Sequence, residues 1–396
     1  MTRSIGRGLP IPPVFGVVVL AVALGLAAAP ARAAEDPYAE RAAGVHGDEA
    51  LWLDVVFGET GAADRLRARL NTEPAPSAAF AARAWPLVCE HDYHASRYPE
   101  AVADCTRAAA VGSDAHVLEI VDLLAGQPPV QAEGSARVAL AAGSHIAVRS
   151  GDYQGWAIAD TGAQISVMMQ SVAEDAHVRI LGESRSVETN AATVAGKIGI
   201  IPEVRIGHAV LRNLPVLVLP DAQLILANGS IRLPFILSLY GLAEFGRMAW
   251  LDHGRWLALG EAAPQGFDGA VPMIWHPLGI GLPLDGVAGR RAAHLDSGAN
   301  ISYLLEAGLQ LLPPGERGRL GVGHRRIGGV GGVVEQDIER LPEASLSLAG
   351  HPLTFADIDV AMDADTGEVA RIGEDVLGRY AAVVLDFKSM QFSVKP

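Results

Sequence analysis

Two aspartates, Asp160 and Asp296, begin nearly identical seven-residue segments of this 396-residue chain. From the aspartate onward five of the seven positions are identical, and the other two exchange Thr for Ser and Gln for Asn. Gly162 and Gly298 permit a tight turn that can project each aspartate into a cleft. Two carboxyl groups held about 3 Å apart share one proton, so that one is a base and the other an acid. Such a pair can activate a water molecule for attack on an amide carbonyl.

The similarity extends well beyond these two segments. A Gly-His pair, an apolar segment ending in glycine, a Gly-Arg pair and a Leu-Asp pair follow each aspartate in the same order. The two apolar-glycine segments are 239–241 and 371–373. We therefore expect two copies of one lobe, over 128–262 and 263–396.

The elements that position the aspartates are predicted to be strands. Both lobes consist of short alternating segments rich in Val, Ile and Leu, separated by Gly, Pro, Asn and Asp. The Pro- and Gly-containing stretch 126–134 indicates a linker. Before it, apolar residues recur at three- and four-residue steps and alanine is abundant, which predicts helices. The predicted fold is mainly β, with two lobes preceded by a small all-α segment over 34–127.

The motifs Asp-Thr-Gly-Ala-x-x-Ser and Asp-Ser-Gly-Ala-x-x-Ser resemble the active-site loops of the pepsin and retropepsin superfamily of aspartic proteases. The resemblance covers both lobes. It implies a bilobal fold of two homologous β-barrel-like lobes, in which Asp160 and Asp296 are catalytic and one monomer suffices. It also implies that Thr161 and Ser297 hydrogen-bond across a pseudo-twofold axis. The short lobes favour the retropepsin-like branch, with its lobes fused in tandem.

The resemblance further implies flaps, which are hairpins that close over a bound peptide. Glycines at the appropriate distance past each aspartate mark these flaps, although a plain surface hairpin is the alternative at both places. Two positions depart from the family pattern. The first flap segment, 187–200, lacks the tyrosine of pepsin-type enzymes, and Arg371 stands where an apolar residue usually supports the catalytic loop. The glycines proposed to contact substrate are Gly196, Gly199, Gly328, Gly329, Gly331 and Gly332.

A third Asp-Thr-Gly triplet occurs at 365–367. Its flanks are polar, no apolar strand leads into it, and no Ala-x-x-Ser follows. We interpret this triplet as a turn, so a lone Asp-Thr-Gly carries little weight without the surrounding repeat.

The N-terminus has the three-part pattern of a secretory signal peptide, predicted over 1–33. Arg3 and Arg7 precede an apolar run, and Ala31 and Ala33 supply the small residues before the cleavage point. A retained membrane anchor is the alternative, but the run is shorter than the roughly 18 residues of a spanning helix. We expect a periplasmic or secreted protein with no stable membrane insertion after cleavage.

Cys89 and Cys105 are the two cysteines of the chain. In an oxidising compartment they are expected to form a structural disulfide, with a catalytic thiol as the alternative. Trp85, Ala101 and their neighbours match one tetratricopeptide-type helix hairpin, which would place the cysteines on facing helices; an unrelated helical bundle is the alternative. The segment would bind a protein partner or act as an inhibitory prosegment.

Composition narrows the function further. A formal net charge of −14 argues against a nucleic-acid partner, which requires a basic face. We expect no cofactor and no metal, because the twelve histidines show no ligand cluster. The predicted function is an exported aspartic endopeptidase, a hydrolase acting on peptides or unfolded protein. The alternative is a catalytically silent peptide-binding module of the same fold with a partner-binding helical segment.

Overall fold

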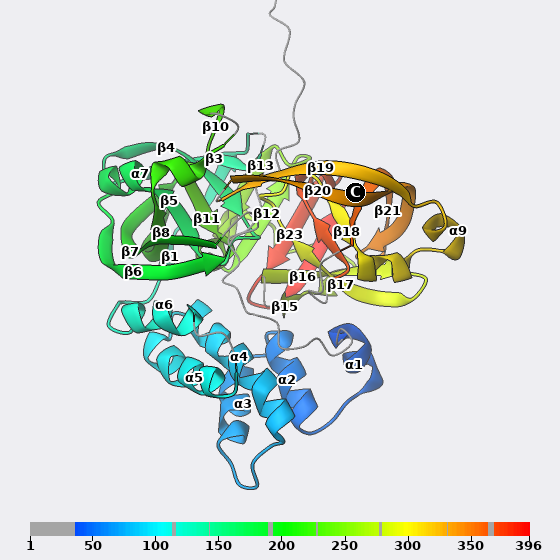
Figure 1. Cartoon of the computed structure of the whole chain (residues 1–396), viewed down its shortest axis with the longest axis horizontal. Coiled ribbons are helices and arrows are strands. Elements are labelled where there is room, and N and C mark those ends of the chain that lie inside the picture. The colour runs from blue at the N-terminus through cyan, green and yellow to red at the C-terminus, as the bar shows by residue number, and fades with distance from the viewer. Residues whose placement is uncertain are drawn as a thin grey trace, which may run out of the picture.

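The computed structural model places a helical segment below two β-lobes (Figure 1). This mainly β, bilobal architecture confirms the predicted fold class. The predicted signal peptide, Gly331 and the 365–367 triplet lie outside the described residues. The structure describes residues 36–112, 116–141, 143–188, 193–226, 229–276, 279–330, 332–362 and 368–396.

The first lobe is a barrel of six strands, closed by pairing between the first and last strands of its series. Two further strands pair with barrel strands, β1 (Gln131–Glu133) with β8 and β6 (Arg179–Glu188) with β7. The barrel order is β3 (His145–Ser150), β4 (Tyr153–Asp160), β11 (Phe235–Ser238), β5 (Ser166–Met169), β8 (Ala209–Leu219) and β7 (Thr193–Ile206).

The second lobe repeats this strand order. Its parallel pairs, β17 with β22 and β18 with β21, stand where β4 with β11 and β5 with β8 stand in the first lobe. The edge strands are β15 (Ile274–His276) and β19 (Gly321–Gly329). The barrel order is β16 (Gly279–Gly286), β17 (Gly289–Leu295), β22 (Ala370–Ile372), β18 (Tyr303–Leu305), β21 (His351–Ala361) and β20 (Gly332–Leu348).

A six-stranded sheet joins the lobes, with three strands from each half of the β region. At its centre β12 pairs antiparallel with β23, and the buried Trp250 lies on this pair. The lobes therefore share one hydrophobic core. The order is β14 (Val271–Pro272), β24 (Gln391–Lys395), β23 (Ala382–Asp386), β12 (Arg247–Leu251), β13 (Trp256–Leu259) and β2 (Ala136–Ala139).

Shorter elements fill the connections. β9 (Ile225–Leu226) and β10 (Ile231–Arg232) form a separate small hairpin. The short helices are α7 (Gln170–Asp175), α8 (Leu239–Ala243), α9 (Pro314–Arg317), α10 (Glu374–Leu377), η1 (Asp221–Leu224), η3 (Gly260–Ala262) and η4 (Glu306–Leu311).

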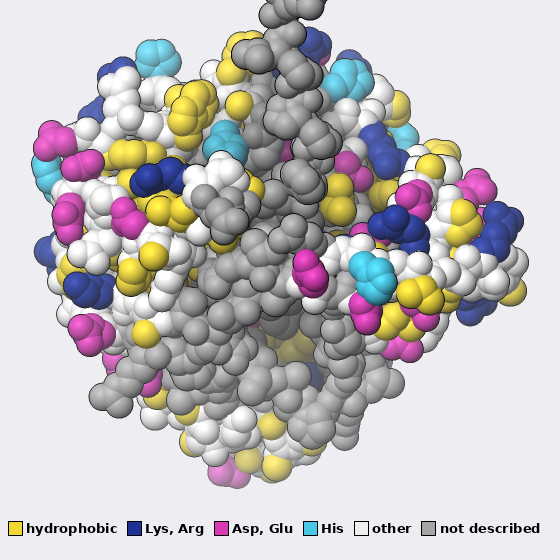
Figure 2. All heavy atoms as spheres, turned by 45° about the horizontal axis from the view of Figure 1, so that its top comes forward, with side chains coloured by type: hydrophobic (Ala, Val, Ile, Leu, Met, Phe, Trp, Pro, Cys, Tyr) yellow, Lys and Arg dark blue, Asp and Glu magenta, His cyan; other side chains and the backbone are white. Residues whose placement is uncertain are grey.

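On the face turned forward in Figure 2, basic side chains are scattered among acidic and hydrophobic ones.

Six helices form the N-terminal segment, and none of the described helices is long and apolar enough to cross a membrane. Cys89 and Cys105 join α4 to α5, which confirms the predicted disulfide. The assignment of this hairpin to the tetratricopeptide class stays a prediction. The helices are α1 (Pro37–Ala43), α2 (Asp48–Val56), α3 (Ala62–Leu70), α4 (Ala78–His94), α5 (Tyr98–Ala110) and α6 (His116–Leu124).

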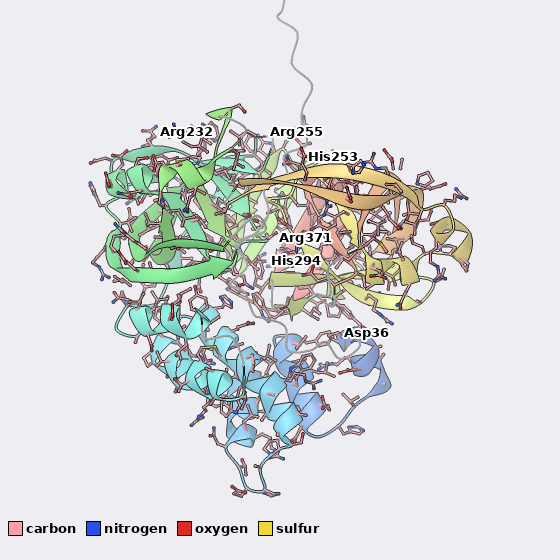
Figure 3. All side chains as sticks on the ribbon, viewed as in Figure 1. Asp36, Arg232, His253, Arg255, His294 and Arg371 are labelled. Atoms are coloured by element: carbon pink, nitrogen blue, oxygen red, sulfur yellow. A yellow bond between two sulfur atoms is a disulfide. The ribbon has the colours of Figure 1, made fainter. Side chains whose placement is uncertain are left out.

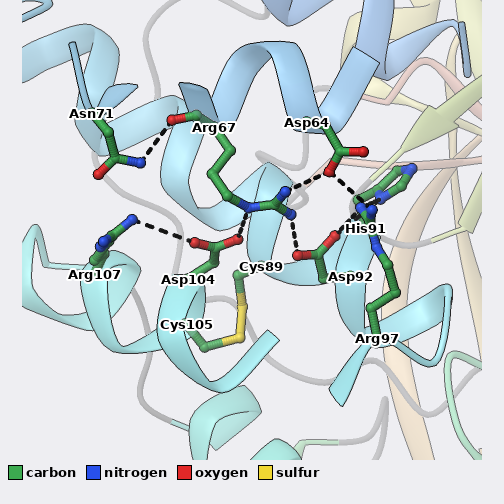
Figure 4. Close-up of polar contacts among 10 residues, drawn as sticks. All are labelled: Asp64, Arg67, Asn71, Cys89, His91, Asp92, Arg97, Asp104, Cys105 and Arg107. Carbon is green, nitrogen blue, oxygen red and sulfur yellow. Dashed lines mark hydrogen bonds and ion pairs between the residues drawn. A yellow bond between two sulfur atoms is a disulfide. The ribbon is translucent and has the colours of Figure 1, made fainter. Parts of the chain in front are cut away.

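Buried ion pairs hold α3, α4 and α5 together (Figure 4). Asp92 and Asp104 are 0% and 1% exposed, and both receive the Arg67 guanidinium. The Arg67 Nε donates to Asp104 at 2.6 Å, and a second nitrogen donates to Asp92. Arg97 also pairs with Asp92. Because a buried carboxylate without a partner is costly, Arg67 is central to this segment.

Candidate active site

The two aspartates stand at equivalent ends of equivalent strands. Asp160 is the last residue of β4, and Asp296 follows β17 directly. Both side chains are buried. The Gly162 backbone N–H donates to Asp160 Oδ1 at 2.8 Å, and the Ala299 backbone N–H donates to Asp296 Oδ1 at 3.0 Å. These bonds within each turn fix the direction of each carboxyl.

The hydroxyl residues next in sequence join the two loops. The Thr161 N–H donates to Ser297 Oγ at 3.0 Å, and Ser297 Oγ–H donates to the Ala159 carbonyl at 2.7 Å. In the reciprocal pair, the Ser297 N–H donates to Thr161 Oγ1 at 2.9 Å, and that hydroxyl donates to the Leu295 carbonyl at 3.0 Å. The four bonds follow the pseudo-twofold pattern that the resemblance implies.

Each glycine of the two turns lies against the opposite aspartate. A Cβ added to Gly162 would lie 2.6 Å from Cγ of Asp296, and one added to Gly298 would lie 2.5 Å from Cγ of Asp160. Because real Cβ atoms do not approach so closely, only glycine at these two positions leaves room for the opposite carboxyl. The structure therefore brings together all six residues predicted for the catalytic loops.

Residues 146–235 match the family model described as aspartyl protease. The match spans the first barrel from β3 to the start of β11 and includes Asp160. The first barrel carries an aspartyl protease domain match. A comparison with curated proteins found no match. Among the described residues, no group of three or more His, Cys, Asp or Glu side chains could hold a metal ion.

The surroundings of the two aspartates give their carboxyl groups unequal pKa values. Burial, together with repulsion from Asp296, raises the pKa of Asp160 well above its ordinary value. Burial also raises the pKa of Asp296, to about 6, but the Arg371 guanidinium opposes this rise by stabilising the ionised form. Asp296 is therefore the more acidic member of the pair.

Arg371 belongs to a buried polar cluster in the second lobe, near His294 in Figure 3. Its Nη1 lies 3.5 Å from Asp296 Oδ2, and its Nη2 lies 3.6 Å from Glu368 Oε2. The other Glu368 oxygen lies 3.5 Å from His294 Nδ1, and the guanidinium lies 5.8 Å from the centre of the Tyr303 ring. The cluster connects directly to the aspartate pair.

The first lobe has no such cluster at the corresponding positions. Arg371 pairs with His294 on β17 and Tyr303 on β18, so strand pairing defines the counterpart of each residue. The sequence marked Arg371 as a departure but missed its partners. The expected correspondence of 239–241 with 371–373 was wrong, because strand pairing places Ile236, and not Leu239, at the position of Arg371. The counterparts defined by pairing are apolar and buried: Ile158 for His294, Val167 for Tyr303 and Ile236 for Arg371. Leu233, which precedes Ile236 by three residues as Glu368 precedes Arg371, is also apolar and buried.

The predicted flap of the second lobe is the β19–β20 hairpin. Gly328 and Gly329 end β19, Gly332 begins β20, and Gly329 pairs with Gly332. Val330 at the tip is buried, and β20 contacts β9 of the first lobe. The hairpin therefore reaches from one lobe to the other, as Figure 1 also shows.

The glycines predicted for the first flap have a different position. Gly196 and Gly199 lie inside β7 of the β6–β7 hairpin and not near its turn. A Cβ at Gly196 would lie 2.7 Å from side-chain carbons of Leu217 and Leu219, and one at Gly199 would lie 2.6 Å from Val178. These contacts give the two glycines a packing role, and substrate contact at either stays a prediction.

Proposed function

We propose that the chain is an exported aspartic endopeptidase that hydrolyses peptide bonds with a water molecule held between Asp160 and Asp296. The observation that carries this proposal is the pair of mirrored loops, in which each carboxyl faces the other and Thr161 and Ser297 lock the arrangement. Nothing in this geometry requires a second copy of the chain, so a monomer would suffice.

The surroundings assign a role to each aspartate. Arg371 stabilises negative charge on Asp296, so Asp296 is the base and Asp160 holds the shared proton. Asp296 takes a proton from the water as its oxygen attacks the carbonyl carbon, while Asp160 protonates the carbonyl oxygen. In the second step the proton on Asp296 passes to the leaving nitrogen, the C–N bond breaks, and Asp160 recovers its proton. Both groups return to their starting states.

The proposed substrates are peptides or unfolded proteins, bound in extended form between the lobes. The β19–β20 hairpin supports this proposal, because its glycine-rich tip can approach a peptide backbone closely. The reach of β20 to the first lobe would let the hairpin cover a substrate bound at the aspartate pair.

Cleavage of an unfolded protein between pH 3 and 8, with and without pepstatin, tests the proposal. We expect Asp160→Asn and Asp296→Asn each to lower kcat/KM by roughly 10²–10⁴-fold, because each removes one proton-transfer group. Asp365→Asn is the matched control in the third Asp-Thr-Gly triplet and should retain activity. Undiminished cleavage by both active-site variants would reject the proposal, and peptide binding without any cleavage would favour the silent binding module.

Export is proposed from the leader-like N-terminus, and the disulfide is consistent with an oxidising compartment. Mass spectrometry of the protein recovered outside the cytoplasm should find a chain beginning at Ala34. A chain that also lacks residues up to about 127 would identify the helical segment as a prosegment. An intact N-terminus would contradict cleavage of a leader.

A further inference from the structure

A cavity of about 310 Å³ lies where the helical segment meets the β-lobes, away from the aspartate pair. Helices α2 and α4 form one side, and α8, β15 and the turn between β23 and β24 form the other. This volume is within the range of small-molecule sites. The lining residues with rings or ionisable groups are Glu90, His91, His94, Tyr240, Glu244, Trp275, Phe387 and Lys388.

Aromatic rings form a continuous row along this cavity. His94 stacks on Tyr240, the Tyr240 and Trp275 rings are 5.7 Å apart at 18°, and the Trp275 and Phe387 rings are 6.2 Å apart at 21°. The faces of such rings carry negative electrostatic potential and attract cations. The row therefore lines the cavity with aromatic side chains, and the parts of their faces that the neighbouring ring leaves uncovered can attract a positive charge.

Two carboxyl groups share the cavity with these rings. Glu90 and Glu244 are half-buried, and within the described part of the chain neither forms a hydrogen bond or an ion pair through its side chain. Burial raises the pKa of Glu90 to about 8 and that of Glu244 to about 7. Lys388 is exposed at the rim, and among the described contacts its ammonium group pairs with neither carboxylate. Burying carboxylates without a partner is unfavourable unless a cation joins them.

We propose that this cavity binds a small organic ammonium ion. The aromatic row would contact the methyl or methylene groups around the nitrogen, and Glu90 and Glu244 would neutralise its charge. With a neutral ligand both groups would stay protonated near neutral pH, whereas a cation favours their ionised forms and would bind more tightly as they ionise. A metal ion fits less well, since the described residues form no cluster of three metal ligands.

Choline is the probe, and 3,3-dimethylbutan-1-ol, which replaces its nitrogen by carbon, is the neutral control of the same shape. By calorimetry with the full chain, choline should bind at least about tenfold more tightly than the alcohol, because only the cation gains the charge-dependent contacts. Its N-methyl proton resonance should move upfield on binding, since the methyl groups would lie over ring faces. Equal affinities, or no choline binding at millimolar concentration, would overturn the proposal.

Isosteric variants test the two carboxylates. Glu90→Gln and Glu244→Gln should each weaken choline binding several-fold to about tenfold, while leaving the alcohol unaffected. Glu100→Gln, at an exposed position on α5, is the matched control. Trp275→Leu tests the aromatic row by loss of the upfield shift. An unchanged choline affinity in the double variant Glu90→Gln/Glu244→Gln, with an unchanged melting temperature, would also overturn the proposal.

The pH dependence supplies an independent measurement. Choline keeps its charge at all pH values, so its affinity should rise between pH 6 and 9 as the two raised carboxyl pKa values are passed. Burial lowers the pKa of His94 and raises that of Tyr240, so both rings stay neutral in this range. We expect the rise in choline affinity to be lost in Glu90→Gln/Glu244→Gln and retained in His91→Gln. The reverse result would assign the pH dependence to His91. Every readout is independent of proteolysis.

Discussion

The asymmetry of the aspartate pair comes from four side chains of the second lobe. Where the first lobe has buried apolar residues behind its aspartate, the second has a cluster ending in Arg371. An arginine next to one carboxyl lowers the pKa of that carboxyl relative to the pKa of the other. Residues outside the two aspartate loops therefore determine which carboxyl of this otherwise symmetric site carries the negative charge.

Replacing the arginine by the residue of the first lobe should shift the pH dependence of activity. Arg371→Ile is combined with Glu368→Leu, since the single change would leave a buried carboxylate unpaired. Because Arg371 stabilises ionised Asp296, its removal raises the pKa of that carboxyl, and less of the active monoanion exists at low pH. The acid limb of kcat/KM against pH should move up by roughly one unit. Arg371→Lys keeps the charge and should restore most of the original profile; an acid limb that stays in place in the double variant would contradict the role of Arg371.

A methyl group at Gly298 should disable the site with little effect on folding. The added Cβ would lie 2.5 Å from Cγ of Asp160, so the carboxyl must move. Misplacement by about 1 Å is enough to lower activity by roughly 10²-fold. Gly315→Ala is the control, because no atom lies within 4 Å of the added carbon there. Full activity of Gly298→Ala would show that the carboxyls are not so closely opposed.

At the scale of elements, spacing predicted where two hairpins lie, and their role as flaps stays a prediction. Counting residues from the aspartates located both hairpins. In the β19–β20 hairpin the predicted glycines lie at the tip, whereas in the β6–β7 hairpin they lie within strand β7. The sequence does not show where a long hairpin turns, because alternation continues through both strands. Likewise Arg371 meets its neighbours by pairing between β17, β18 and β22, which are far apart in sequence.

The helical segment should depend on one arginine. Arg67→Met would leave the buried Asp92 and Asp104 without that partner, and the free energy of unfolding of the segment should fall by about 3–5 kcal/mol. Arg65→Met, which removes an exposed pair with Asp54, should cost less than about 1 kcal/mol. Urea unfolding followed by circular dichroism compares the two. Similar losses in both variants would argue against a special role for the buried pairs.

At the scale of the whole molecule, the sequence predicted two related lobes but not how they are joined. The repeat identified the Leu-Asp pairs at the ends of β12 and β23, yet gave no sign that these strands pair with each other. Pairing across such a separation depends on complementary edges in the folded lobes. The cavity at the helical segment was also beyond prediction, since five distant stretches of chain contribute to it.

The shared six-stranded sheet has a consequence for how the protein is made. When the first barrel has left the ribosome, β12 has no neighbour on one side until β23 is synthesised. An uncovered strand edge can recruit the matching strand of another copy. Two chains could then exchange second lobes, each completing the other's sheet, in a domain-swapped dimer with two hybrid sites. The loop between η3 and β14, by its length and stiffness, would decide between this exchange and closure within one chain.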